Sequence, residues 1–161
     1  GGPADVVELT LALAREMLDA AGLPDADPAK ALESGAAMDS WRAMIRAQGG
    51  DPDAPLPVAR ESEVLRADRD GVVGAIDAYG IGVAAWRLGA GRARKEDPVS
   101  AGAGVLLRVR PGDAVRRGDA LAELRTDEGS RLAAARDLAA AAIAVGEAAP
   151  DPVPLVIERV S

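Results

Sequence analysis

The first fifty residues carry apolar side chains at helical spacing. Within residues 4–21, Val6, Leu9, Leu13 and Met17 recur every three or four positions, which is the pattern of an amphipathic helix. Other apolar residues flank this stripe, and the polar residues occupy only a narrow face. So wide an apolar arc predicts a helix that packs against more than one neighbour.

Two further helices are predicted before residue 50. Asp27 followed by Pro28 is a helix start, with a capping side chain and a proline in the first turn, and this short helix stops near Gly35. Residues 36–47 have apolar side chains on one side and predict a third helix. Those side chains are Met38, Trp41 and Ile45.

A proline-rich stretch then divides the chain. Residues 52–63 include Pro52, Pro55 and Pro57, and such a stretch is typical of a linker. We therefore expect a helical segment at 1–51, a linker at 52–63 and a second domain at 64–161.

Beyond the linker the pattern changes to short apolar runs separated by turn residues. The runs predict strands at 71–76, 105–109, 120–124 and 153–160, and helices at 78–88 and 130–145. Strands and helices do not alternate regularly, so the expected fold class is α+β.

Composition excludes several kinds of function. The 161 residues contain no His and no Cys, so neither a Ser-His-Asp triad nor a cysteine nucleophile nor the usual zinc ligand sets can form. The net charge of −7 argues against a nucleic-acid surface. We expect no metal and no cofactor, no membrane partner, and a cytoplasmic location.

Two groups of charged residues are candidates for binding. Asp25, Asp27, Asp51 and Asp53 lie among Pro and Gly, where Asp commonly caps helices and turns, so a metal site is the less favoured interpretation. The basic cluster of Arg92, Arg94 and Lys95, with Arg87 before it, has the chemistry to hold a phosphate. The alternative is a solvated surface in which these cations pair with neighbouring acids.

The region around this cluster resembles a known family. Ile76-Asp77-Ala78, then Gly-Ile-Gly-Val-Ala-Ala at 80–85, and Leu-Gly-Ala-Gly-Arg at 88–92 followed by Lys95-Glu96-Asp97 are similar to the carboxy-terminal domain of thymidine and pyrimidine-nucleoside phosphorylases. The Gly-Pro-x-Asp start of the first helix and the Ala-Gln-Gly-Gly-Asp sequence at 47–51 resemble the same family, although Trp41 stands where Phe is common. The resemblance runs from about residue 2 to the end of the chain.

A second motif, Gly-Asp-x-Val-x-x-Gly-Asp-x-Leu at 112–121, predicts tight turns with Val115 and Leu121 pointing inward. It also resembles biotinyl and lipoyl carrier domains, which implies a barrel-sandwich-like hairpin region. Those domains attach their group to a lysine just beyond this point, where this chain has Glu128, and neither Lys30 nor Lys95 is placed to substitute.

The family resemblance implies an enzyme that converts thymidine and phosphate to thymine and 2-deoxyribose 1-phosphate, active as a homodimer. The family's phosphate-binding loop and pyrimidine-binding residues match no position here, so we expect no catalytic residue in this chain. It is then a structural, inactive carboxy-terminal part whose partner is the missing amino-terminal part, consistent with a start at Gly1 without Met. The alternative is a stand-alone binding module for a phosphorylated ligand or partner protein.

Overall fold

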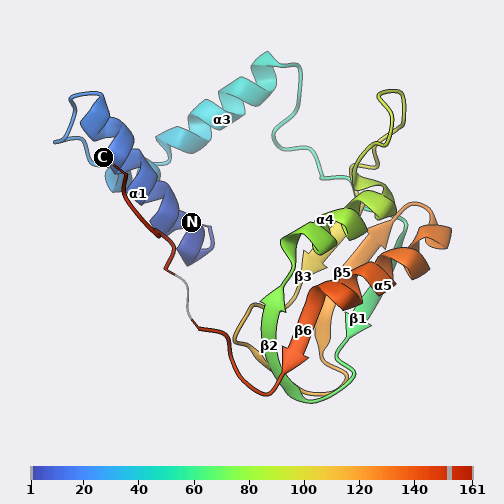
Figure 1. Ribbon diagram of the computed structural model, residues 1–161. Coiled ribbons are helices and arrows are strands. Elements are labelled where there is room, and N and C mark those ends of the chain that lie inside the picture. Colours follow the sequence, from blue (N-terminus) through green and yellow to red (C-terminus); the bar gives the residue numbers. More distant parts are fainter. Residues whose placement is uncertain (1, 152–153, 161) are drawn as a thin grey trace. The chain divides into compact units, whose positions relative to one another are not determined.

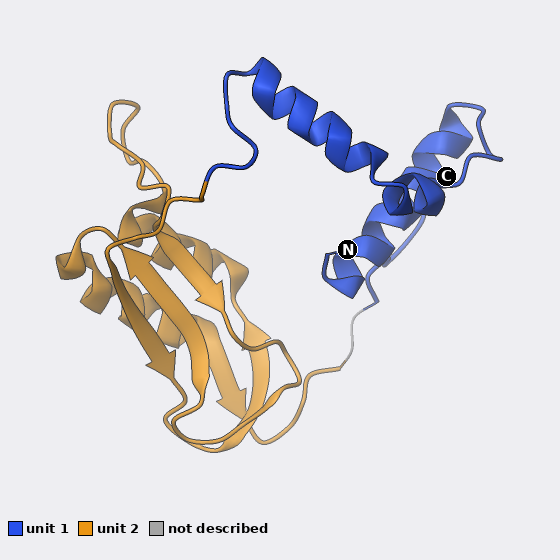
Figure 2. Ribbon diagram, turned by 180° about the vertical axis from the view of Figure 1, so that it is seen from behind, with its two compact units in different colours: residues 1–54, 152–161 blue, residues 55–151 orange. Residues whose placement is uncertain are grey.

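The computed structural model describes residues 2–151 and 154–160 (Figure 1). Two compact units divide the chain: residues 1–54 with 152–161, and residues 55–151 (Figure 2). Five α-helices and two three-stranded antiparallel sheets make up the regular structure of the described part, a mixed α+β fold. No helix in the part described is long and apolar enough to cross a membrane.

The first unit contains three helices, α1 (Ala4–Ala20), α2 (Pro28–Glu33) and α3 (Ala36–Ala47). All three agree with the periodicity of the sequence. Asp27 caps α2 as expected, because its side chain accepts a hydrogen bond from the backbone N–H of Ala29 at 3.0 Å. Asp51 accepts one from the N–H of Asp53 in the following turn, also at 3.0 Å.

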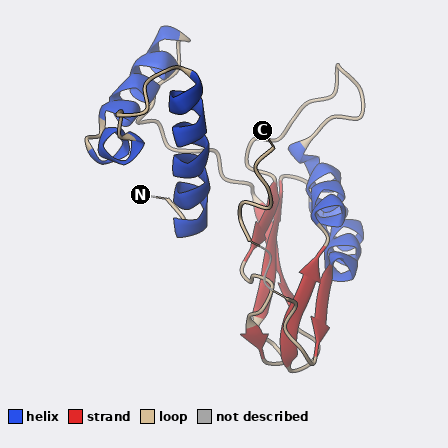
Figure 3. Cartoon of the chain, turned by 60° about the vertical axis from the view of Figure 1, so that its left-hand side comes forward, coloured by secondary structure: helices blue, strands red, loops and turns tan. Residues whose placement is uncertain are grey.

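The second unit is built around two small sheets. The elements in chain order are β1 (Glu61–Arg66), β2 (Gly71–Ile76), α4 (Ala78–Ala85), the π-helical turn η1 (Trp86–Ala90), β3 (Gly104–Leu107), β4 (Ala114–Val115), β5 (Ala120–Thr126), the 3₁₀ turn η2 (Gly129–Arg131), α5 (Leu132–Ala142) and β6 (Ile143–Gly146). One sheet has the order β1-β5-β3 and the other β4-β2-β6. Figure 3 shows the helices of this unit on one side of the strands.

The core of this unit lies between α4, α5 and the strands. Leu124 and Ala122 of β5, Leu88 of η1, and Ala135 and Ala139 of α5 are fully buried. In β5 the side chains of Ala122, Leu124 and Thr126 are buried while those of Glu123 and Arg125 between them are half-buried, the alternation of a strand with one face on a core. The chain contains no phenylalanine, and the small buried alanine side chains of α5 allow this helix to pack closely against the rest of the core.

Two sequence predictions are wrong at the carboxy-terminal end. Residues 130–145 are not one helix, because α5 ends at Ala142 and Ile143–Gly146 pairs with β2 as strand β6. The predicted strand at 153–160 is absent from the described residues 154–160, and Val153 lies outside them. A strand requires a hydrogen-bonding neighbour, and no described segment pairs with these residues.

The remaining differences are smaller. The helix predicted at 78–88 ends as α4 at Ala85 and continues as η1, in which Gly89 has a φ of 108°. Strands β1 and β4 were not predicted, since β1 begins at Glu61, within the stretch predicted as a linker at 52–63, and β4 is only two residues long.

Replacing Leu124 with Ala tests the core. Its side chain is fully buried, and we expect the free energy of unfolding to fall by about 2–5 kcal/mol, the usual cost of such a cavity. Urea denaturation followed through Trp86 fluorescence measures this in a Trp41→Phe background, because the chain has two tryptophans. Leu56→Ala is the control, at a side chain that is 86% exposed. Equal losses for the two variants would contradict the assigned core.

Replacing either of two glycines in the second unit with alanine is expected to change the stability of the protein, in opposite directions. At Gly71 a Cβ would lie 2.5 Å from the carbonyl oxygen of Gly146 on β6, so we expect Gly71→Ala to destabilise the protein by about 1–3 kcal/mol. At Gly82, within α4, a Cβ meets no neighbouring group within 4 Å, so Gly82→Ala stabilises by about 0.5–1 kcal/mol. Thermal unfolding curves of both variants check the two signs, and a stable Gly71→Ala protein would refute the close approach of β2 and β6.

Candidate functional site

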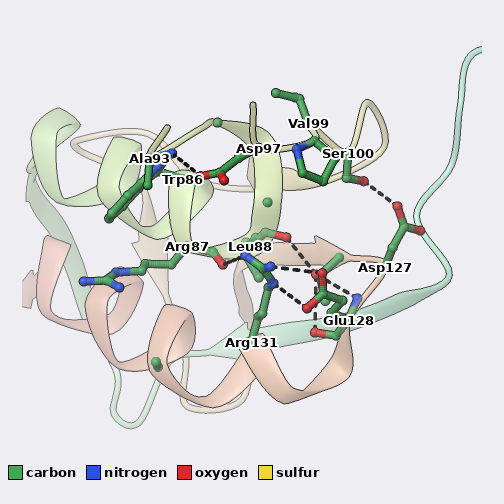
Figure 4. A pocket seen from close by; sticks show the side chains of 15 residues that line it. Trp86, Arg87, Leu88, Ala93, Asp97, Val99, Ser100, Asp127, Glu128 and Arg131 are labelled. Atoms are coloured by element: carbon green, nitrogen blue, oxygen red, sulfur yellow. Dashed lines mark hydrogen bonds and ion pairs between the residues drawn. The ribbon is translucent and has the colours of Figure 1, made fainter. Parts of the chain in front are cut away.

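A pocket of about 790 Å³ opens beside η1 in the second unit (Figure 4). Its walls come from η1, the following loop, the end of β5 and the start of α5. The lining residues are Trp86, Arg87, Leu88, Gly89, Gly91, Ala93, Asp97, Pro98, Val99, Ser100, Thr126, Asp127, Glu128, Arg131 and Ala134.

A buried hydroxyl joins two walls of the pocket. Thr126 is fully buried at the end of β5, and its Oγ1 donates a hydrogen bond to the carbonyl oxygen of Leu88 at 2.7 Å. The same Oγ1 accepts a bond from the backbone N–H of Glu128 at 3.1 Å. The hydroxyl is therefore committed to structure and is not a free nucleophile.

The carboxylate of Glu128 is held by Arg131. The guanidinium donates from Nε and Nη2 to the two carboxylate oxygens at 2.9 and 3.0 Å, the paired geometry in which arginine binds carboxylate most strongly. These hydrogen bonds hold the pKa of Glu128 below its usual value and raise the pKa of Arg131. This ion pair engages the Glu128 carboxylate within the fold.

Asp127 joins three segments at the rim. It accepts hydrogen bonds from the hydroxyl of Ser100 and, at 3.1 Å, from the backbone N–H of Arg60. The bond from Ser100, and secondly that from Arg60, lower the pKa of Asp127. Gly102 lies against the same connection, because a Cβ there would come within 2.5 Å of the backbone nitrogen of Ala59.

The loop after η1 is organised by Asp97. One of its carboxylate oxygens accepts hydrogen bonds from the backbone N–H groups of Ala93 at 3.2 Å and Arg94 at 2.8 Å. A bound phosphate would seek such amides, but here an internal carboxylate already uses them. The guanidinium carbon of Arg87, which also lines the pocket, lies 4.7 Å from the centre of the Trp86 ring, a cation–π contact.

The predicted anion-binding residues lie outside the pocket lining. Arg92, Arg94 and Lys95 are all exposed on the loop that Asp97 holds. Arg92 donates a hydrogen bond to the carbonyl oxygen of Lys95 at 3.2 Å, so these residues share one loop tip. The remaining predicted cation, Arg87, does line the pocket.

The two neighbouring acids of the pocket are unsuited to act as general acids. Asp127 and Glu128 have lowered pKa values and stay ionised at neutral pH, whereas a general acid needs a pKa near the working pH. Within residues 2–151 and 154–160 no group of acids is placed to hold a metal ion. The hydrogen-bonded pairs of the pocket were not predicted from the sequence. For Glu128 and Arg131 the spacing of three residues could have indicated the ion pair.

Comparison with known proteins confirms the family resemblance that the sequence motifs indicated. Residues 72–146, which include the whole pocket lining, match the family model for the pyrimidine nucleoside phosphorylase C-terminal domain. The chain is 47% identical over 160 residues to thymidine phosphorylase of Mycobacterium tuberculosis, a match that covers 99% of this chain and 38% of that protein. It is 40% identical over 131 residues to pyrimidine-nucleoside phosphorylase of Geobacillus stearothermophilus, covering 74% of this chain and 30% of that protein.

The chain thus spans well under half the length of these curated relatives. Its matched part carries the name of their carboxy-terminal domain, and the similarity to the Mycobacterium protein extends over the helices of the first unit as well. The chain belongs to the thymidine and pyrimidine-nucleoside phosphorylase family, of which it represents the carboxy-terminal part.

Proposed function

We propose that this chain is the carboxy-terminal part of a phosphorylase that converts thymidine and phosphate to thymine and 2-deoxyribose 1-phosphate. The observation that carries the proposal is the 47% identity to a thymidine phosphorylase over 99% of the chain. In this proposal the substrates are a pyrimidine nucleoside and phosphate, and the complete enzyme is a cytoplasmic homodimer and a pentosyltransferase.

Within such an enzyme the chain serves as scaffold. In its pocket the Thr126 hydroxyl and the Glu128 carboxylate are engaged in structural bonds. Residues 1–51 then belong to the larger α/β domain of the enzyme, and residues 64–151 form the carboxy-terminal domain with its barrel-sandwich-like hairpins. The catalytic groups lie in the region that the relatives have beyond the match, and they act in a cleft that closes as the domains move.

A chimeric enzyme tests this function. This chain replaces the matched 38% of the Mycobacterium tuberculosis enzyme, and release of thymine from thymidine and phosphate is followed by chromatography. We expect the chimera to retain activity within about tenfold of the parent, a change of about 1.4 kcal/mol in the barrier. The Mycobacterium enzyme without the replaced part is the negative control.

The chain alone is expected to release no thymine above the uncatalysed rate. Turnover by the chain alone would overturn the scaffold role. A folded chimera without activity would instead refute membership in a working phosphorylase.

A second candidate function rests on the exposed cations of the loop. We propose that Arg92, Arg94 and Lys95 form an anion-binding surface for a phosphorylated ligand or partner protein. The supporting observation is that Asp97 fixes the loop backbone while all three cationic side chains are exposed.

Titration of the chain with inorganic phosphate tests the anion surface. We expect binding at low salt that is lost in about 1 M salt, where charges more than about 3 Å apart are screened, and lost in the Arg92→Ala, Arg94→Ala double variant. The control is Arg116→Ala with Arg117→Ala, an exposed pair whose backbone N–H groups, and not their side chains, donate hydrogen bonds to the carboxylates of Asp119 and Asp70. Equal weakening by both double variants would show non-specific attraction only.

A further inference from the structure

The helices of the first unit bury none of their residues within the described chain. On α1 the apolar stripe that defines the helix is open, with Val6 and Leu13 each 55% exposed and Met17 66% exposed. On α3 Met38, Trp41 and Met44 are exposed as well. Apolar surface of this extent on a folded protein marks an interface, and short helices in water depend on burial of such a face for their stability.

A second exposed apolar segment lies on α1. Residues 154–160 include Leu155, Val156, Ile157 and Val160, all exposed, and Ile157 is 82% exposed. An ion pair of 2.8 Å between Arg159 and Glu16 ties this segment to the helix, as the course of the chain along α1 in Figure 1 also shows. The ion pair therefore holds residues 154–160 beside α1 within the first unit.

The segment has the sequence of a buried strand. In an extended chain Leu155, Ile157 and Arg159 point to one side, and Val156, Glu158 and Val160 to the other, so each side carries two apolar residues and one charged residue. Apolar side chains on both sides are typical of a strand inside a sheet whose two faces are covered by helices. Yet residues 154–160 make no backbone hydrogen bond among the residues described, so their N–H and C=O groups are free to pair with another strand.

We propose that residues 154–160 add as a strand to a β-sheet in the region that the longer relatives have beyond this chain, with α1 covering one face of that sheet. This inference rests on the proposed function, since it takes this chain to be part of a longer phosphorylase. The length of the relatives indicates which partner pairs with this segment. The matched chain is 38% of the Mycobacterium relative, so more than half of such a polypeptide lies outside the described structure. Strand addition pairs the free backbone groups, and the same contact buries the stripe of α1.

Hydrogen exchange read by mass spectrometry tests the strand. In the chimera with the Mycobacterium enzyme, we expect amide exchange in residues 155–160 to slow by at least about tenfold relative to the chain alone, because sheet amides open only by local unfolding. Exchange in the chimera as fast as in the chain alone would overturn the inference. Protection already present in the chain alone, at any concentration, would also overturn it, since the partner would then be the chain itself or a second copy.

A pair of substitutions separates docking from ordinary stability. Ile157→Asp and Leu56→Asp place the same charge at side chains that are 82% and 86% exposed in the described structure. We expect both to leave the melting temperature of the chain alone within about 1 °C, as surface changes do. In the chimera only Ile157→Asp lowers it, by several degrees, and an equal effect of both variants would contradict the docked strand.

Activity and amide protection of the chimera test the proposed function and the docked strand separately. An active chimera with unprotected residues 155–160 refutes the strand and leaves the phosphorylase assignment intact. A folded, inactive chimera with protected residues supports the strand and refutes the assignment. If the chimera does not fold, the same amides are followed after mixing the chain with the remaining region of the Mycobacterium enzyme, where absence of protection in a formed complex refutes the strand.

Discussion

The second unit depends on the hydrogen bond from the Thr126 hydroxyl to the carbonyl oxygen of Leu88. Leu88 lies in a π-helical turn, where the regular pattern of helical bonds is lost, and its side chain is fully buried. A buried carbonyl without a partner is costly, and Thr126 supplies that partner from the end of β5. Because β5 is paired on both edges, the bond connects the central strand of one sheet to the turn that forms the pocket wall.

The positions of Asp127 and Glu128 follow from the same constraint. Once Thr126 is fixed, the next residue reaches Ser100 and Arg60, and the one after it reaches Arg131. Both carboxylates at this end of the pocket are thus engaged with other groups of the fold. These bonds tie the end of β5 to the loop after η1 and to the start of α5, and so give the pocket wall a defined shape.

Periodicity predicted α1, α3 and β2 closely because their signals are local. The short strands were harder, since β4 and β6 exist through pairing with β2 and not through their own sequence. Ile143 and Val145 continue an alanine-rich helical pattern, and only the partner strand decides against the helix. In the candidate site, the cluster of cations was visible in the sequence, whereas Asp97 as the internal ligand of the loop amides was not, because hydrogen bonds of a loop depend on its fold.

Residues 154–160 belong to the first unit, which makes residues 55–151 an insertion between two parts of one unit. The chain then has to bring two distant points of its sequence together in order to complete the first unit. That closure adds an entropic cost which grows only slowly with the length of the insert, so insertions and deletions in the second unit can be tolerated in evolution without loss of the first.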